Sequence, residues 1–220
     1  PTKAGDIWRT SYRGLVDGGQ AWEEMLHLTA PNTTWPRHNG SLAVQGENVY
    51  AVWQEARIPG QYRVYFCRST DNGKTWGGEM FIGTAGGQWR GPSITCDGPL
   101  LHVAYVECLL YGSQQTVRYT RSTDYGVTWS KSVVLSVYYG DEPCIAVSGS
   151  VVHVCFTDYW DFVSNPEIGY CRSTDYGRTW ENATRLTRDM GITHGCTMGV
   201  SGSDVHIACH DYRSADGGRH

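Results

Sequence analysis

Ser122-Thr123-Asp124-Tyr125-Gly126-Val127-Thr128-Trp129 is one of three nearly identical stretches in this chain. The other two occupy residues 69–76 and 173–180, and a degenerate copy occupies residues 17–22. The copies follow one another at intervals of about 50 residues, which is typical of proteins built from repeated supersecondary units. The sequence therefore predicts a repeat architecture.

Each copy carries an Asp two residues before a Gly, between runs that read as strands. The Asp accepts hydrogen bonds from nearby backbone N–H groups, and the Gly supplies the positive φ of a tight hairpin turn. The closing Trp is large enough to fill the space between neighbouring sheets. We therefore interpret both residues of every copy as structural: Asp17, Asp71, Asp124, Asp175, Trp22, Trp76, Trp129 and Trp180. A catalytic role for these acids is the alternative, although an active site rarely needs identical copies.

Each full repeat contains four strand candidates, here called A to D in chain order. In the third repeat they cover residues 144–148, 151–157, 167–172 and 183–186, with the repeated turn between C and D. Alternating polarity and many β-branched and aromatic residues favour strands over helices. The first two full repeats run over residues 41–82 and 93–136.

The two ends of the chain carry complementary half-units. Residues 7–12 and 25–29 read as C and D strands, whereas residues 197–200 and 205–210 read as A and B strands. Together they would complete one blade and close a ring without open edges.

The sequence thus predicts an all-β fold, a four-bladed β-propeller of four-stranded antiparallel blades in a single domain. The expected blades cover about 37–83, 90–137, 141–187, and a composite of 194–220 with 1–30. A piece of a larger ring and a dimer of two open halves are the alternatives, and a closed ring would be a monomer.

Composition limits the function classes. The chain has 220 residues, a formal net charge of −4 and no apolar run of 18 residues, so we expect no membrane span. The mild acidity argues against nucleic acid as a partner, because a basic patch would be expected. Three Asn-x-Ser/Thr sequons, at Asn32, Asn39 and Asn182, are compatible with a secreted protein.

Eight cysteines occur without Cys-x-x-Cys spacing, which argues against a zinc site. Most lie within strand-like runs, where a free thiol behaves as a small apolar side chain. We interpret them as buried free thiols, with disulfides as the alternative. They are Cys67, Cys96, Cys108, Cys144, Cys155, Cys171, Cys196 and Cys209.

The aligned B strands place a carboxylate at one position in every repeat. These candidate catalytic residues are Glu55, Glu107, Asp158 and Asp211. Pseudo-symmetry would bring them to one face of the ring, opposite the repeated turns. Closely spaced carboxylates raise one another's pKa, which suits general-acid chemistry, and they could instead bind a cation in the central channel. The alternative is that each carboxylate only bonds its own loop amides or a local Arg.

Other candidate ligand-binding residues fall at the same face. His38, Arg90, Asp141 and His194 precede the A strands, and Arg57 and Arg213 follow the acids of their own B strands. Arg offers a bidentate fork to an anionic group. Tyr159 and Trp160 are the main aromatic candidates for stacking on a sugar ring. Packing of these rings between blades is an equal alternative.

The repeated stretch resembles the Asp-box, or bacterial neuraminidase repeat, of sialidases and related β-propeller proteins. The resemblance is complete in three copies, extends over nearly the whole chain, and implies propeller blades without specifying an activity. Sialidases hold their substrate carboxylate with three arginines. They use a Tyr–Glu pair as the nucleophile and an Asp as the acid/base. The resemblance therefore implies Arg57, Arg90 and Arg213 as carboxylate holders. It implies Asp158 or Asp211 as acid/base, with Glu55 or Glu107 as its partner.

Two features depart from the sialidase pattern. No Phe/Tyr-Arg-Ile-Pro motif opens the first blade, and Arg57-Ile58-Pro59 carries those letters only in a B–C loop. No residue is identified as a nucleophile by motif. We therefore expect a propeller that binds carbohydrate or another small ligand on its loop-bearing face. A sialidase-like glycoside hydrolase is the alternative.

Overall fold

The computed structural model describes residues 10–16, 21–29, 37–58, 61–86, 91–108, 115–136, 139–159, 166–188 and 191–212. Within these ranges every regular element is a β-strand, and all strand pairs are antiparallel. The all-β prediction is therefore confirmed.

Three complete blades follow one another along the chain, each a four-stranded meander. The first comprises β5 (Arg37–Gln45), β6 (Asn48–Ile58), β7 (Gln61–Ser69) and β8 (Met80–Ala85). The second comprises β9 (Ser93–Asp97), β10 (Leu100–Cys108), β11 (Gln115–Ser122) and β12 (Val133–Val134). The third comprises β13 (Tyr139–Ser148), β14 (Val151–Tyr159), β15 (Glu167–Ser173) and β16 (Thr184–Arg185). The four strands predicted for the third repeat are thus present, with the expected order and pairing.

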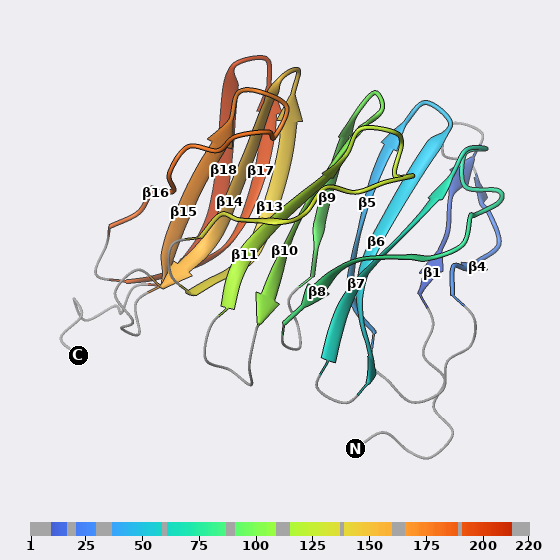
Figure 1. Cartoon of the computed structure of the whole chain (residues 1–220), viewed down its shortest axis with the longest axis horizontal. Helices are drawn as coiled ribbons and strands as arrows, with labels where there is room; N and C mark the ends of the chain where they lie inside the picture. The colour runs from blue at the N-terminus through green and yellow to red at the C-terminus, as the bar shows by residue number, and fades with distance from the viewer. Residues whose placement is uncertain are drawn as a thin grey trace.

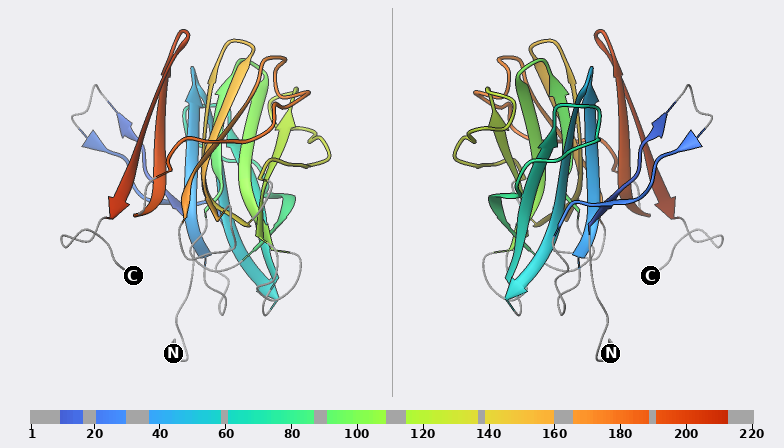
Figure 2. Two further views of the ribbon diagram at one scale, coloured as in Figure 1. Left: turned by 90° about the vertical axis from the view of Figure 1, so that its left-hand side faces the viewer. Right: turned by 90° about the vertical axis from the view of Figure 1, so that its right-hand side faces the viewer.

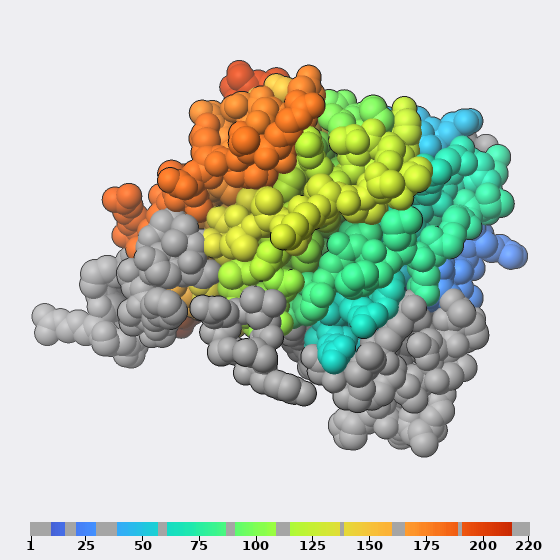
Figure 3. Space-filling view, viewed as in Figure 1, coloured from blue at the N-terminus to red at the C-terminus, as the bar shows by residue number. Residues whose placement is uncertain are grey.

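The blades stand side by side in an arc, as Figure 1 shows. Their inner strands β5, β9 and β13 contact one another in sequence, and β13 contacts β17 (Ile192–Ser201). The outer strands and turns of successive blades pack as adjacent bands on the opposite side (Figure 3). This is the arrangement of propeller blades around an axis lined by their A strands.

The half-units at the two ends form separate sheets. β17 pairs with β18 (Asp204–Tyr212), and β1 (Ser11–Tyr12) pairs with β4 (Leu26–His27). A short hairpin of β2 (Leu15–Val16) and β3 (Ala21–Trp22) lies between β1 and β4 in the chain. Among the described strands β18 pairs only with β17, so the expected composite blade and the closure of the ring stay predictions. The two end hairpins lie on the same side of the arc in Figure 2 and at its opposite ends in Figure 1.

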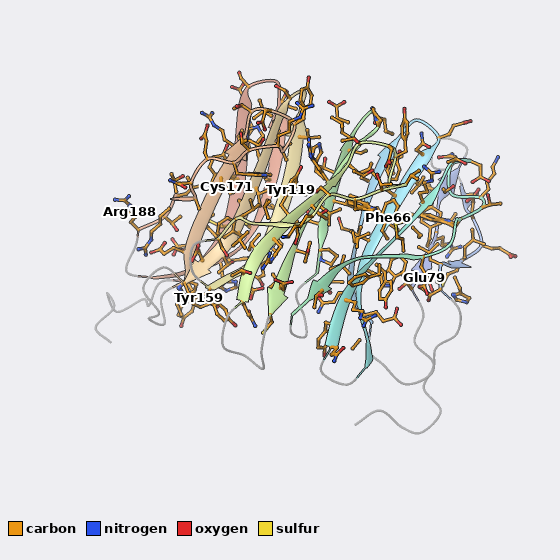
Figure 4. The ribbon with its side chains drawn as sticks, viewed as in Figure 1. Phe66, Glu79, Tyr119, Tyr159, Cys171 and Arg188 are labelled. Atoms are coloured by element: carbon orange, nitrogen blue, oxygen red, sulfur yellow. The ribbon has the colours of Figure 1, made fainter. Side chains whose placement is uncertain are left out.

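The core lies in the seams between blades. Val64 and Phe66 of the first blade pack with Leu101 and Val103 of the second, and all four side chains are almost fully buried. A second cluster joins the second and third blades in the same way, through Val117, Tyr119, Val154 and Phe156 among others. Burying such side chains contributes roughly 1.5–3 kcal/mol each. The labelled Phe66 and Tyr119 in Figure 4 mark these two seams.

The repeated turns, residues 69–76, 122–129 and 173–180, have a common hydrogen-bond pattern. In the second turn Ser122 Oγ donates to Asp124 Oδ1 at 2.7 Å, and Thr128 donates to Asp124 from its backbone N–H at 2.8 Å and its hydroxyl at 2.5 Å. The hydrogen bonds from Thr128 and Ser122 lower the pKa of Asp124 to about 2. Asp71 and Asp175 accept equivalent hydrogen bonds in the other two turns. All three aspartates therefore stabilise a turn through hydrogen bonds.

The tryptophans that close these turns reach back to the preceding unit. Trp129 lies edge-on to Phe66 with ring centroids 5.0 Å apart, and Trp180 lies likewise against Tyr119 at 4.6 Å. Trp76 makes the same contact with Tyr12 of β1 at 5.0 Å, so β1 occupies the place of a C strand in front of the first blade. Trp22, in the degenerate copy, is 59% exposed. Asp17 lies outside the described residues.

Candidate functional site

The end of the blades opposite the repeated turns is called the loop-bearing end here, where strands β6, β10 and β14 finish. The B-strand carboxylates lie at this end but not in one cluster. Glu55 and Asp158 are fully buried, Glu107 forms an ion pair with Arg118 at 2.5 Å, and Asp211 is exposed on the edge strand β18. Each points into the gap before its own blade, because it shares a strand face with the residues of that seam.

Asp158 has the least compensated environment of the four. It continues the row Val152, Val154 and Phe156 toward the second blade, and neither carboxylate oxygen has a hydrogen-bond partner among the described residues. Burial raises the pKa of Asp158 to about 7, although the positive charge of Arg185 acts in the opposite direction. Burial therefore favours the neutral form of this carboxyl group at pH values where an exposed Asp is ionised.

Glu167 lies directly opposite Asp158 on β15, and its side chain is also fully buried. Arg185 Nη2 contacts Glu167 Oε1 at 2.6 Å, and the Thr187 hydroxyl donates to Glu167 Oε2. Like charges directly opposite on paired strands are destabilising. The pair is accommodated because Glu167 takes the cation and hydroxyl, while burial favours the protonated form of Asp158.

The inner strands bend at this same end. A β-bulge interrupts β5 at Asn39, β13 after Asp141 and β17 at Gly195. Of the five non-glycine residues with positive φ in the described part of the chain, three lie in the repeated turns. The other two are Asn39 and Glu142, both at these bulges, with φ of 35° and 47°. A positive φ is unfavourable for Glu and is a frequent mark of functional positions.

Glu142 is exposed, and its carboxylate binds Thr157 on the neighbouring strand of its own blade, which in turn contacts the next unit. Thr157 donates its hydroxyl to Glu142 Oε2 at 3.1 Å and accepts the backbone N–H of Gly195 at 3.1 Å. Asp141, buried beside it, accepts the backbone N–H of Glu142 at 2.8 Å. These bonds hold an acidic side chain at the line where the inner strands meet.

Two aromatic rings lie at the same end of the third blade, on the strand face of Asp141 and Thr157. Tyr139 and Tyr159 are cross-strand partners at the loop-bearing end of the third blade, with centroids 5.1 Å apart in an edge-to-face arrangement. Both are half-buried, and Figure 4 shows the labelled Tyr159 at the end of β14. Glu142, Asp141, Tyr139 and Tyr159 are called the third-blade site below, and Asp158 lies on the other face of the same sheet.

The remaining predicted ligand-binding residues contribute little to this site in the described structure. His194 is exposed at the start of β17, with its ring 5.8 Å from that of His210. The side chains of His38 and Arg57 lie outside the described residues, as do Arg90, Trp160 and Arg213.

The central-channel cation also stays a prediction. Across the described ranges no group of three or more His, Cys, Asp or Glu side chains is placed to hold a metal ion. The same residues contain no helix with the length and apolar character needed to cross a membrane.

Sequence reasoning missed Glu142, Glu167 and Arg185. Glu142 stands in Asp141-Glu142-Pro143, directly before an A strand, and a charged residue ahead of Pro was the available signal. Glu167 and Arg185 gain their roles from strand register, which places both on the face of Asp158. No sequence pattern reports that register.

The fold is shared with several carbohydrate-active enzymes. Penicillium chrysogenum α-L-arabinanase complexed with arabinobiose matches with a TM-score of 0.57 and 14% identity, over 94% of this chain and 71% of its own. The GH93 α-L-arabinofuranosidase of Fusarium graminearum matches with 0.54 and 15%, over 81% and 67%. Trypanosoma rangeli sialidase, in complex with 2,3-difluorosialic acid, matches with 0.57 and 14%, over 87% and 36%.

At these identities the likeness shows the fold alone. The chain spans between 36% and 71% of the lengths of these three solved structures. No protein-family model matches the sequence, and no curated protein matches it either.

Proposed function

We propose that this chain binds a neutral oligosaccharide at the loop-bearing end of the third blade. The observation that carries the proposal is Glu142, an exposed acid held at positive φ beside Thr157 and the Tyr139–Tyr159 pair. A carboxylate accepts hydrogen bonds from sugar hydroxyls, and aromatic rings pack against the C–H faces of a sugar.

The charge of the site favours a neutral glycan over an acidic one. Its acidic groups are Asp141 and Glu142, which are adjacent in β13. An anionic sugar would meet net negative charge in this place, since like charges repel. The structural likeness to an arabinanase and an arabinofuranosidase supports carbohydrate as the ligand class and arabinobiose as the first probe.

Hydrolysis is a second candidate, favoured by the buried Asp158 opposite Glu167. A carboxyl group with a raised pKa can donate a proton to a leaving oxygen, and glycosidases use two carboxyl groups in this way. Asp158 is fully buried in this structure, whereas a proton donor has to reach the glycosidic oxygen. Binding is therefore the function that the geometry supports better.

One experiment tests both candidates. Arabinobiose and 3′-sialyllactose are titrated into the natural chain and into Glu142→Gln, with release of arabinose measured from the same samples at about pH 5 to 8. We expect saturable binding of arabinobiose, weaker binding of sialyllactose, and an affinity loss of about tenfold in Glu142→Gln, equal to about 1.4 kcal/mol.

The matched control is Glu181→Gln, which removes an exposed acid near the repeated turn of the same blade. Its affinity should stay within about twofold of the natural chain, since a surface ion pair contributes little. Equal affinity of Glu142→Gln and the natural chain would place the ligand elsewhere. Release of arabinose that Asp158→Asn abolishes would establish the hydrolase instead.

A further inference from the structure

Four cysteines lie on the facing surfaces of two neighbouring sheets. Cys144 and Cys155 are directly opposite each other on β13 and β14, and Cys196 and Cys209 are directly opposite on β17 and β18. β17 packs against both β13 and β14, so the two pairs meet across the seam. Figure 1 shows these four strands as neighbours at one end of the arc.

The sulfur atoms are linked through Cys155. Its side chain is fully buried and interacts with those of both Cys144 and Cys196. Cys144 and Cys196 are half-buried, and Cys209 is exposed. All eight cysteines of the chain are free thiols in this structure.

The positions of Cys144 and Cys155 meet the requirements of a disulfide. Residues directly opposite in an antiparallel pair have Cα atoms about 4.5 or 5.5 Å apart, depending on whether they are hydrogen-bonded partners. Disulfides join Cα atoms about 4.4–6.8 Å apart, so the bridge needs only side-chain rotation.

The two thiols also differ in character. The hydrogen bond from Cys155 lowers the pKa of the Cys144 thiol to about 7, because it favours the thiolate. The same interaction, together with burial, raises the pKa of Cys155. The thiolate is the nucleophile in disulfide chemistry, and Cys144 is also the more accessible sulfur of the pair.

We propose that Cys144 and Cys155 form a redox-active dithiol that closes to a disulfide on reaction with a low-molecular-weight disulfide such as oxidised glutathione. The Cys144 thiolate attacks one sulfur of oxidised glutathione and releases one glutathione thiolate. Cys155 then loses its proton and attacks the Cys144 sulfur of the mixed disulfide, releasing the second glutathione. The protein dithiol is oxidised by two electrons, and one glutathione disulfide is reduced to two thiols.

The site adjoins the bulge that carries Glu142. Cys144 is the first residue paired with β14 after this bulge, and the Cys196 thiol lies 3.8 Å from the Glu142 carbonyl oxygen. A bridge at Cys144 would tie the end of the bulge to β14. This dithiol chemistry does not depend on the glycan proposal, and its test does not use glycan binding.

The test is equilibration of the native chain in glutathione buffers of increasing oxidised fraction, followed by thiol alkylation and peptide mapping. We expect the number of free thiols to fall by two at a single midpoint and the mapped bridge to join Cys144 to Cys155. Cys171→Ala is the control, since Cys171 is also buried but lies on the opposite face of the same blade (Figure 4). It should lose the same two thiols.

Cys155→Ala should form no protein bridge and should lose only one free thiol, because Cys144 then carries glutathione as a mixed disulfide. A natural chain that keeps every thiol free in fully oxidised glutathione would overturn the proposal. A mapped bridge between Cys155 and Cys196 would overturn the pairing. Peptide mapping of the natural chain gives this answer even if a variant fails to fold.

Discussion

Asp158 is a buried carboxyl group whose pKa of about 7 makes the stability of the fold depend on pH. The value for an unfolded Asp is about 3.9, so between about pH 4 and 7 the folded chain binds more protons than the unfolded chain. Its stabilising contribution is therefore complete below about pH 4 and is lost as the pH rises through 7.

Asp158→Asn should remove this loss, because the amide does not ionise. We expect the free energy of unfolding of the variant, relative to the natural chain, to rise by about 4 kcal/mol between pH 4 and pH 8. Urea unfolding of both chains at these two pH values measures this difference in the free energy of unfolding. Asp204→Asn, at an exposed position that starts β18, is the control and should leave the pH dependence unchanged. Parallel curves for Asp158→Asn and the natural chain would mean that Asp158 is ionised throughout.

The sequence predicts the position of Asp158 in its blade but not the residues that surround it. The carboxylates at the ends of the B strands were predicted from alignment of the repeats, and the structure shows Glu55, Glu107 and Asp158 at equivalent places. Their differences come from partners: Arg118 for Glu107, and Glu167 with Arg185 around Asp158. These partners depend on register and on neighbouring blades, which one sequence does not report.

The repeated turn is the element that sets the spacing between blades. Gly126 has a φ of 85°, and a Cβ placed there would lie 2.4 Å from the Phe66 ring of the preceding blade. Gly149, in an A–B turn, has a φ of 56°, and a Cβ there would meet nothing within 4 Å. Replacing each glycine by alanine therefore distinguishes the cost of the backbone conformation alone, at Gly149, from that cost plus overpacking between blades, at Gly126.

Gly149→Ala should cost about 1 kcal/mol, since only the left-handed conformation is penalised. Gly126→Ala should cost about 3 kcal/mol, because overpacking against Phe66 is added. The unfolding midpoints of both variants in urea, at equal slope, measure this difference. Equal costs would show that the seam between the first two blades yields to an added methyl group.

The strand order of the blades could be predicted because turn chemistry and alternation are local properties. The sequence predicts the third-repeat A strand over residues 144–148, whereas β13 already begins at Tyr139. The difference is the bulge after Asp141, which lets the strand continue beyond Pro143. Glu142, the central residue of the proposed binding site, lies in that bulge and was missed for this reason.

The whole molecule is an arc of blades whose loop-bearing end and turn-bearing end differ in chemistry. The turn-bearing end repeats the same hydrogen-bonded turn three times. The loop-bearing end differs from blade to blade, and it holds Glu142 at an unfavourable positive φ. Ring closure was predicted from the complementary half-units, yet β18 and β1 lie in separate sheets. Local sequence signals define each blade but do not set the angle between blades, which is a property of the seams.

Hydrogen exchange of the chain with and without saturating arabinobiose tests whether a glycan binds at the third-blade site. We expect slower amide exchange at residues 139–145, 157–159 and 192–196, where the third-blade site and its neighbouring bulge lie. The repeated turns at 122–129 and 173–180 should exchange at unchanged rates. Protection confined to the turns, with none around Glu142, would contradict the account.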